Sequence, residues 1–117
     1  MTQKNITGRW SFREDFGFGK DEGFAELTQT GEKITGFVVF TERIEGDQPF
    51  RVEQEVVGEF DGTNLKLTAI KVEILDAEEP IEYHLDNWEG ILNAQDQLVG
   101  HSYDNEDTFG VFLMERL

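Results

Sequence analysis

The chain lacks cysteine and is poor in proline, histidine and basic residues. Its 117 residues include no Cys, two Pro, two His and ten Lys or Arg against 25 Asp or Glu. Without cysteine there are no disulfides or thiolate metal sites, and the redox compartment stays open. Residues Met1 to Asn5 lack the apolar core of a signal peptide, and no apolar run has the length of a membrane helix. We therefore expect a cytoplasmic protein, although a secreted chain with its signal segment removed would read the same.

The shortage of basic residues gives a formal net charge of −15. A field of this sign repels nucleic acids and anionic membrane surfaces, so neither is an expected partner. The acidic residues are scattered along the chain, which argues against a disordered acidic tail. Solubility alone would also account for such acidity.

The hydrophobic pattern indicates an all-β protein that forms a single domain over residues 1–117. Near the start, Ile6, Gly8, Trp10 and Phe12 alternate with polar residues, which is the two-residue period of a strand with one buried face. No helix is predicted. The eight predicted strands run from about Ile6 to Arg13, Phe24 to Gln29, Lys33 to Glu42, Phe50 to Phe60, Leu65 to Leu75, Ile81 to Leu92, Gln97 to Tyr103 and Thr108 to Leu117.

Local signals refine this pattern. Asp61-Gly62 predicts a tight hairpin, because glycine accepts the positive φ that such a turn requires. In the fifth strand the apolar residues change face between Ala69 and Ile70, which predicts a β-bulge. In the sixth strand the alternation is also broken, between Leu85 and Trp88.

Eight short strands with hairpin-length connections favour an eight-stranded antiparallel up-and-down β-barrel over a β-sandwich, because closure removes the two sheet edges. Successive connections then alternate between the two ends. One end, which we call the mouth, receives loops near 14–23, 43–49, 76–80 and 104–107. The mouth loops carry many acids: Glu14, Asp15, Asp21, Glu22, Glu45, Asp47, Asp76, Glu78, Glu79, Asp104, Glu106 and Asp107. The other end, which we call the floor, receives three tight turns and both termini.

Gly8-Arg9-Trp10 on the first strand, together with Arg116 on the last, resembles the calycin superfamily of lipocalins, fatty-acid-binding proteins and avidins. The resemblance implies a ligand-binding barrel in which Arg116 packs over the Trp10 ring at the closed end, a cation–π contact. It also implies that both residues are structural.

Within that superfamily, Ile6 to Trp10 looks like the opening of an avidin, and Leu98 to His101 with Asp107 to Phe109 is similar to the end of an avidin chain. The polar residues that follow the avidin tryptophan are absent, as is the series of tryptophans that walls the biotin site. Trp88 is the only tryptophan besides Trp10. No biotin-contacting residue is therefore assigned.

The interior of such a barrel is filled by side chains or holds one small ligand. The candidate ligand-binding residues are Phe16 and Phe18, in a glycine-rich lid, and Gln54, Tyr83 and Tyr103 on the strands. The acidic mouth favours a small neutral or cationic apolar molecule over an anion. Arg116 is assigned to the floor and Arg51 is expected to face outward, so neither would receive a fatty-acid carboxylate.

No catalytic residue, metal site or cofactor is assigned. His84 and His101 lack metal-ligand spacing and are expected to be ordinary hydrogen-bonding side chains. Asp104 to Asp107 offers four oxygen-bearing side chains that could hold Ca²⁺, but it lacks the spacing of an EF-hand and is typical of a solvated turn. Glu82, Tyr83 and His84 could serve acid–base chemistry, as many such trios could.

Three functions remain. The first is a non-enzymatic carrier of a small apolar or amphipathic molecule. The second is a filled barrel acting as an interaction or oligomerisation module, because Phe37 to Phe40 and Phe109 to Met114 are apolar on both strand faces, which predicts a homodimer. The third is a small-molecule enzyme on a calycin-like barrel.

Overall fold

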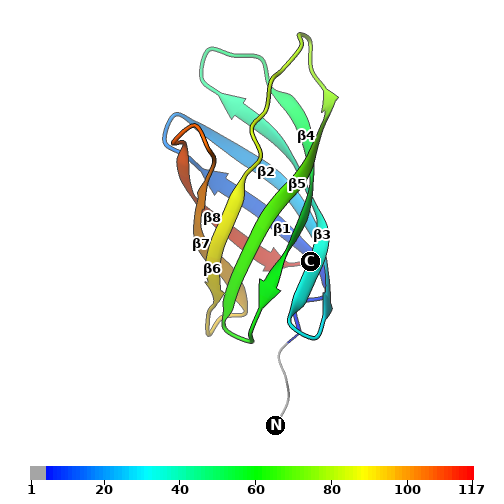
Figure 1. Ribbon diagram of the computed structural model, residues 1–117. Helices are drawn as coiled ribbons and strands as arrows, with labels where there is room; N and C mark the ends of the chain where they lie inside the picture. Colours follow the sequence, from blue (N-terminus) through cyan, green and yellow to red (C-terminus); the bar gives the residue numbers. More distant parts are fainter. Residues whose placement is uncertain (1–4) are drawn as a thin grey trace.

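The computed structural model describes residues 5–117 and shows eight antiparallel strands in chain order closing into one barrel (Figure 1). The strands are β1 (Gly8–Asp15), β2 (Gly19–Thr30), β3 (Lys33–Ile44), β4 (Phe50–Phe60), β5 (Asn64–Asp76), β6 (Asn87–Leu92), β7 (Gln97–Tyr103) and β8 (Phe109–Arg116). β1 pairs with β2 on one side and with β8 on the other, so Trp10 lies opposite Arg116. The predicted up-and-down barrel is confirmed. The described residues include no helix able to cross a membrane.

The barrel interior toward the floor is filled by large apolar side chains, because every second residue of each strand points inward and most of these residues are apolar. Trp10, Phe12, Phe40, Phe60, Leu67, Trp88, Leu98 and Met114 are all buried and belong to one core cluster. The Trp10 indole Nε1 donates to the Ile6 carbonyl oxygen at 2.9 Å, so its one polar atom is satisfied inside the core.

The predicted bulge in the fifth strand is present. The pairing of β4 with β5 shifts between Glu55 and Val56, so that Ala69 pairs with Val56 and Lys71 with Glu55, leaving Ile70 as the extra residue. Ile70 is half-exposed, while Ala69 before it is buried. The bulge thus reconciles the two apolar faces of this strand.

Two predicted boundaries were wrong. The first connection is only the short turn around Phe16 to Phe18, since β1 extends to Asp15 and β2 begins at Gly19. The sixth strand begins at Asn87 rather than Ile81, and residues 77–86 form no strand. This segment descends alongside the upper part of β5 in Figure 1, and the pairing of β5 with β6 covers Asn64 to Thr68 of β5. Pro80 cannot donate a hydrogen bond to a neighbouring strand, and a bulge bends the strand that contains it. Segment 77–86 therefore leaves the sheet, and it turns Tyr83 and Asp86 toward the barrel interior.

Candidate functional site

Three carboxyl side chains stand side by side inside the barrel, near the mouth. The strand register places Glu14 of β1 opposite Asp21 of β2, and Asp21 opposite Glu42 of β3. All three are buried, and Asp21 is fully so, at 0% exposure. We call Glu14, Asp21 and Glu42 the carboxyl row.

The sequence-based assignment of Glu14 and Asp21 to a solvent-exposed mouth loop was therefore wrong. The strands simply continue further than the apolar pattern does. Glu14 follows Trp10 and Phe12 at the same two-residue spacing, and Glu42 follows Phe40. Extending the inward face of each strand by one position, whatever its chemistry, would have found both carboxyls.

The sequence pattern that marks Asp21 as an inward residue is weaker, because Gly23 lies between Asp21 and the inward Ala25 and interrupts the run of apolar side chains. Gly23 lies opposite both Phe12 and Phe40 in the register. A Cβ at this position would come within 1.9 Å of the Val39 carbonyl oxygen. Glycine is therefore required at this position, where β2 and β3 approach closely. Because it has no apolar side chain, the two-residue pattern of apolar residues in β2 cannot be recognised there.

A fourth carboxyl is brought in by segment 77–86. The buried Gln54 amide fixes its end: Nε2 donates to Asp86 Oδ2 at 2.7 Å, and Oε1 accepts from the Asp86 backbone N–H at 3.1 Å. Asp86 is buried as well. Its backbone carbonyl accepts from the Ala69 N–H at 2.9 Å, which ties the segment to β5 just before the bulge.

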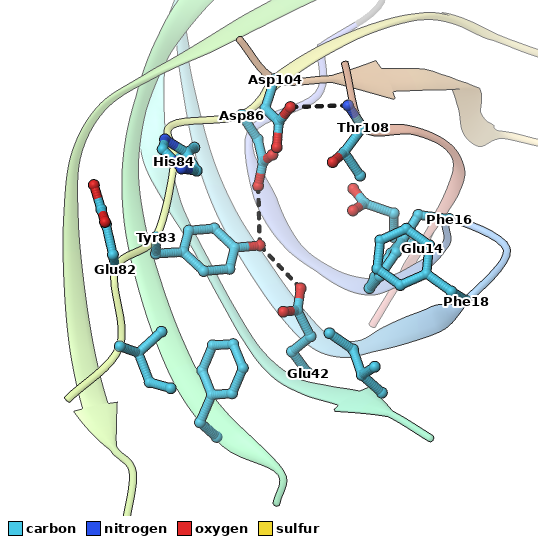
Figure 2. Close-up of a pocket in the computed structure, with 13 residues that line it drawn as sticks. Glu14, Phe16, Phe18, Glu42, Glu82, Tyr83, His84, Asp86, Asp104 and Thr108 are labelled. Carbon is cyan, nitrogen blue, oxygen red and sulfur yellow. Dashed lines mark hydrogen bonds between the residues drawn. The ribbon is translucent and has the colours of Figure 1, made fainter. Parts of the chain in front are cut away.

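Tyr83 points from the same segment into the barrel and connects the two groups of acids. Its hydroxyl lies 3.1 Å from Glu42 Oε1 and 3.2 Å from Asp86 Oδ2, as the dashed lines in Figure 2 show. Its ring packs against Phe40 and Phe50, with centroid separations of 6.1 and 6.0 Å. We call the carboxyl row together with Tyr83 and Asp86 the mouth network.

Fixed hydrogen-bond donors to this network are few. The Trp88 indole Nε1 donates to Glu14 Oε1 at 2.8 Å, and Gln54 donates to Asp86 as above. Among the residues that the structure describes, none donates a hydrogen bond to either side-chain oxygen of Asp21. Asp21 instead faces the carboxyl groups of Glu14 and Glu42.

Burial and mutual repulsion favour the protonated forms of these acids. Desolvation, followed by the charges of Glu42 and Glu14, raises the pKa of Asp21 to about 12. Desolvation, followed by the charge of Glu14, raises the pKa of Asp86 to about 7. Desolvation also raises the pKa of Glu14 and of Glu42.

Above the network lies a pocket of about 290 Å³ that opens at the mouth (Figure 2). Its apolar walls come from Phe16, Phe18, Ile44, Phe50, Ile81 and Tyr83, and its acids are Glu14, Glu42, Glu82, Asp86 and Asp104. His84 and Thr108 complete the lining. None of the described residues that line it is Lys or Arg. The pocket therefore combines aromatic surface with buried carboxyl groups.

The structure brings together three of the five sequence-predicted ligand-binding residues. Phe16 and Phe18 line the pocket from the first turn, with ring centroids 4.8 Å apart, and Tyr83 lines it from the opposite side. Gln54 lies beneath the pocket and acts on it through Asp86. Tyr103 does not belong to the site: it shares the outer face of β7 with His101, on which its ring stacks, while the neighbouring Ser102 is buried. Tyr103 lies five positions after the buried Leu98 on the same strand, an odd number, so its side chain points to the opposite, outer face.

The remaining candidates take local roles. His84 Nε2 lies 3.7 Å from Glu106 Oε1 at the rim of the pocket. The Asp104 carboxylate accepts the backbone N–H groups of Glu106 and Thr108, at 2.9 and 3.0 Å. No cluster of three or more His, Cys, Asp or Glu able to hold a metal ion is found within residues 5–117.

Trp10 and Arg116 lie at the floor, far along the barrel from this pocket. The Arg116 guanidinium carbon is 4.4 Å from the centroid of the Trp10 ring. Arg116 also pairs with Asp96, with Nε 2.6 Å from Oδ2, and donates from Nη2 to the Asn5 carbonyl oxygen at 2.8 Å. The guanidinium thus covers the buried ring and links the last strand, the turn before β7 and the N-terminal segment.

Comparison of the chain with protein-family models, with curated proteins and with solved structures found no match.

Proposed function

We propose that the protein is a non-enzymatic binding protein for a small organic cation with an apolar part, and that the ligand occupies the mouth pocket. One observation carries this proposal: the pocket has aromatic walls above buried carboxyl groups, and no Lys or Arg among its described lining residues. Buried carboxylates are costly unless they are paired with a positive charge. A ligand ammonium group would supply that charge, and its apolar part would pack against Phe16, Phe18 and Phe50.

The filled lower interior also supports a ligand at the mouth rather than deep in the barrel. Trp88 and Phe12 meet edge to face below the carboxyl row, with centroids 6.1 Å apart, and both are buried. A long fatty acid would have to displace this packing and place its carboxylate beside other carboxyls. We therefore expect anionic lipids to be rejected on charge as well as on length.

The test compares three molecules of equal chain length and different charge: octylammonium, octanol and octanoate. Each is titrated at pH 8 and low salt, by calorimetry and by tryptophan fluorescence in the Trp10→Phe variant, in which Trp88 is the only tryptophan of the sequence. The Trp88 indole contacts Glu14 beneath the pocket. We expect saturable binding of octylammonium and none of octanoate. Equal binding of octanol and octylammonium would show a neutral apolar site instead. No saturable binding by any of the three, or by benzylammonium, would refute the proposal.

A matched pair of variants locates the site. Glu42→Gln removes a carboxylate that lines the pocket, whereas Glu59→Gln removes one from the exposed face of β4 near the floor. Because a hydrogen bond to a charged group contributes about 1.5–3 kcal/mol, Glu42→Gln should weaken octylammonium binding roughly ten- to a hundredfold. Glu59→Gln should leave it within about twofold, as expected for a distant surface charge. An equal loss in both variants would indicate a nonspecific charge effect.

Kinship with the calycins is a separate proposal. Its support is the closed eight-stranded barrel together with the contact of Arg116 with Trp10, the pair that the Gly8-Arg9-Trp10 resemblance implied.

A second candidate function, self-association, is favoured by the outer face of β6 to β8. Phe109 and Val111 of β8 are 64% and 62% exposed, and Ile91 of β6 is 44% exposed. The strand register places Ile91 beside Val99 and Val99 beside Leu113, so the apolar side chains form one surface. Phe37 of β3, on another part of the barrel, is also partly exposed. A homodimer through β6 to β8 would leave the mouth pocket open, so both functions are compatible.

A further inference from the structure

The mouth network contains more hydrogen-bond acceptors than fixed donors. The Tyr83 hydroxyl carries one hydrogen, yet it lies within hydrogen-bond distance of both Glu42 Oε1 and Asp86 Oδ2. If both carboxyls were ionised, one of these contacts would place two lone pairs against each other. A proton on either carboxyl removes the conflict, because the resulting O–H donates to the Tyr83 oxygen.

Asp21 gives independent evidence that the mouth network lacks hydrogen-bond donors. It is fully buried, and no fixed donor in the described part of the chain gives a hydrogen bond to either of its oxygens. Its neighbours on both sides of the row are the carboxyls of Glu14 and Glu42, which both line the pocket. An ionised Asp21 would be a buried charge with no partner, so this position also requires a proton.

Within residues 5–117, no Lys or Arg lines the pocket beside Asp86 to replace these protons with a positive charge. The polar groups that face Asp86 or lie beside it at the pocket are Glu14 of β1, Asp21 of β2, Glu42 of β3, Gln54 of β4, Glu82, Tyr83 and His84 of its own segment, and Asp104 after β7. His84 is the one basic group among them, and it lies toward Glu106 at the rim. Every other ionisable neighbour is acidic, which is consistent with the raised pKa of Asp86.

We propose that the mouth pocket exchanges a proton of its carboxyl network for a protonated amine. This inference rests on the proposed function and specifies its ligand class. The ligand ammonium donates its N–H groups to Asp86 and Glu42, and the proton held between these carboxyls and Tyr83 leaves to solvent. Charge in the network is conserved, since one cation replaces another. Asp21 keeps its proton throughout, because it lies beneath the pocket with no access to the ligand.

The exchange requires a ligand with N–H bonds. A primary ammonium has three, so it can satisfy both carboxyl oxygens that now compete for the Tyr83 hydrogen. A quaternary ammonium carries the same charge but donates no hydrogen bond, and it would leave one of these oxygens without a partner. Discrimination between the two kinds of cation therefore separates proton exchange from simple charge attraction to an aromatic, acidic pocket.

The experiment uses benzylammonium and benzyltrimethylammonium, which share the ring and the charge. Both are titrated into the protein by calorimetry at pH 6, 7 and 8, in two buffers that differ in ionisation enthalpy, so that released protons are counted. With Asp86 titrating at about 7, benzylammonium should release about 0.9 proton at pH 6 and about 0.1 at pH 8. Because benzylammonium binds to the ionised network, the affinity of the protein for benzylammonium should rise about tenfold between pH 6 and pH 8. Benzyltrimethylammonium should bind more weakly at each pH.

Two variants test the assignment. Asp86→Asn removes the exchanging carboxyl while keeping an acceptor oxygen for Gln54, and it should weaken benzylammonium binding and abolish proton release at pH 6. Asp47→Asn, in the exposed turn before β4, removes the same charge outside the pocket and should change neither. Carbon-13 NMR of the ligand-free protein should show the Asp86 carboxyl titrating near pH 7.

The outcomes distinguish failure of the proton exchange from failure of the binding function. Binding of benzylammonium without proton release at pH 6, equal affinity for the quaternary analogue, or an Asp86 carboxyl that titrates near 4 would overturn the exchange and leave the binding function standing. Failure of every amine to bind would overturn both.

Discussion

Asp21→Asn should stabilise the protein at neutral pH, which is the opposite of what is expected for most substitutions of a fully buried residue. The folded protein holds the Asp21 proton far more tightly than the unfolded chain does, because its pKa rises from 3.8 to about 12. Folding above pH 4 therefore requires proton uptake. At pH values below the pKa of the unfolded state, Asp21 does not lower the free energy of unfolding. As the pH rises from that value toward the pKa of the folded state, Asp21 lowers the free energy of unfolding by an increasing amount. Asparagine has nearly the same shape and needs no proton.

The magnitude follows from the pH and the unfolded pKa. At pH 7 the difference from 3.8 is about 3 units, and each unit corresponds to 1.36 kcal/mol, so proton uptake costs at most about 4 kcal/mol. This is a large share of the ~5–15 kcal/mol by which a domain is usually stable. The asparagine amide can also donate to Glu14 and Glu42, which flank it in the row. Asp21→Asn should thus raise the free energy of unfolding by up to about 4 kcal/mol at pH 7, and by nearly nothing at pH 4.

The assay is urea unfolding followed by tryptophan fluorescence at pH 4, 5.5, 7 and 8.5. The matched control is Glu22→Gln, the next residue along β2, which is exposed on the outer face. The control should follow the wild-type protein at every pH. A gap between Asp21→Asn and wild type that stays constant from pH 4 to 8.5 would refute the reasoning. A variant that is less stable than wild type at pH 7 would refute it as well.

Two further predictions concern other parts of the barrel. Trp10→Ala should lower the free energy of unfolding by ~3–5 kcal/mol, because the ring is buried in the core. Arg116→Ala should lower it by about 1 kcal/mol, because it removes an exposed cation–π contact. In both variants the folded molecules should bind octylammonium as the wild-type protein does. Trp10→Phe that leaves the melting temperature unchanged but abolishes binding would place the site at the floor instead. Sedimentation at micromolar concentration should give a dimer mass for the wild-type protein and a monomer mass for Val111→Lys, which puts a charge at the centre of the exposed β8 face. A clean wild-type monomer would contradict the dimer.

The fold could be predicted from the sequence because each of its decisive signals is local. Alternation around Trp10 and along Phe50 to Phe60 predicts strands, Asp61-Gly62 predicts a hairpin, and the change of phase at Ile70 predicts the bulge. Short connections make neighbouring strands antiparallel, and eight such strands close. The sequence also placed Phe16 and Phe18 at the mouth, and both line the pocket; it named Tyr83 as an inward strand residue, whereas the structure brings Tyr83 to the pocket on a segment that is not a strand.

The site itself was decided by the tertiary structure. The register between β1, β2 and β3 brings Glu14, Asp21 and Glu42 into one row, and the sequence does not state that register. Acidic residues are common in this sequence, so composition cannot distinguish the buried ones from the solvated ones. The return of segment 77–86 into the barrel depends on the Gln54 contacts with Asp86, which connect residues 32 positions apart. Alternation determines which way a strand residue points. The burial and the neighbouring carboxyls that raise the pKa of an acidic residue arise only when the strands pair and the barrel closes around them.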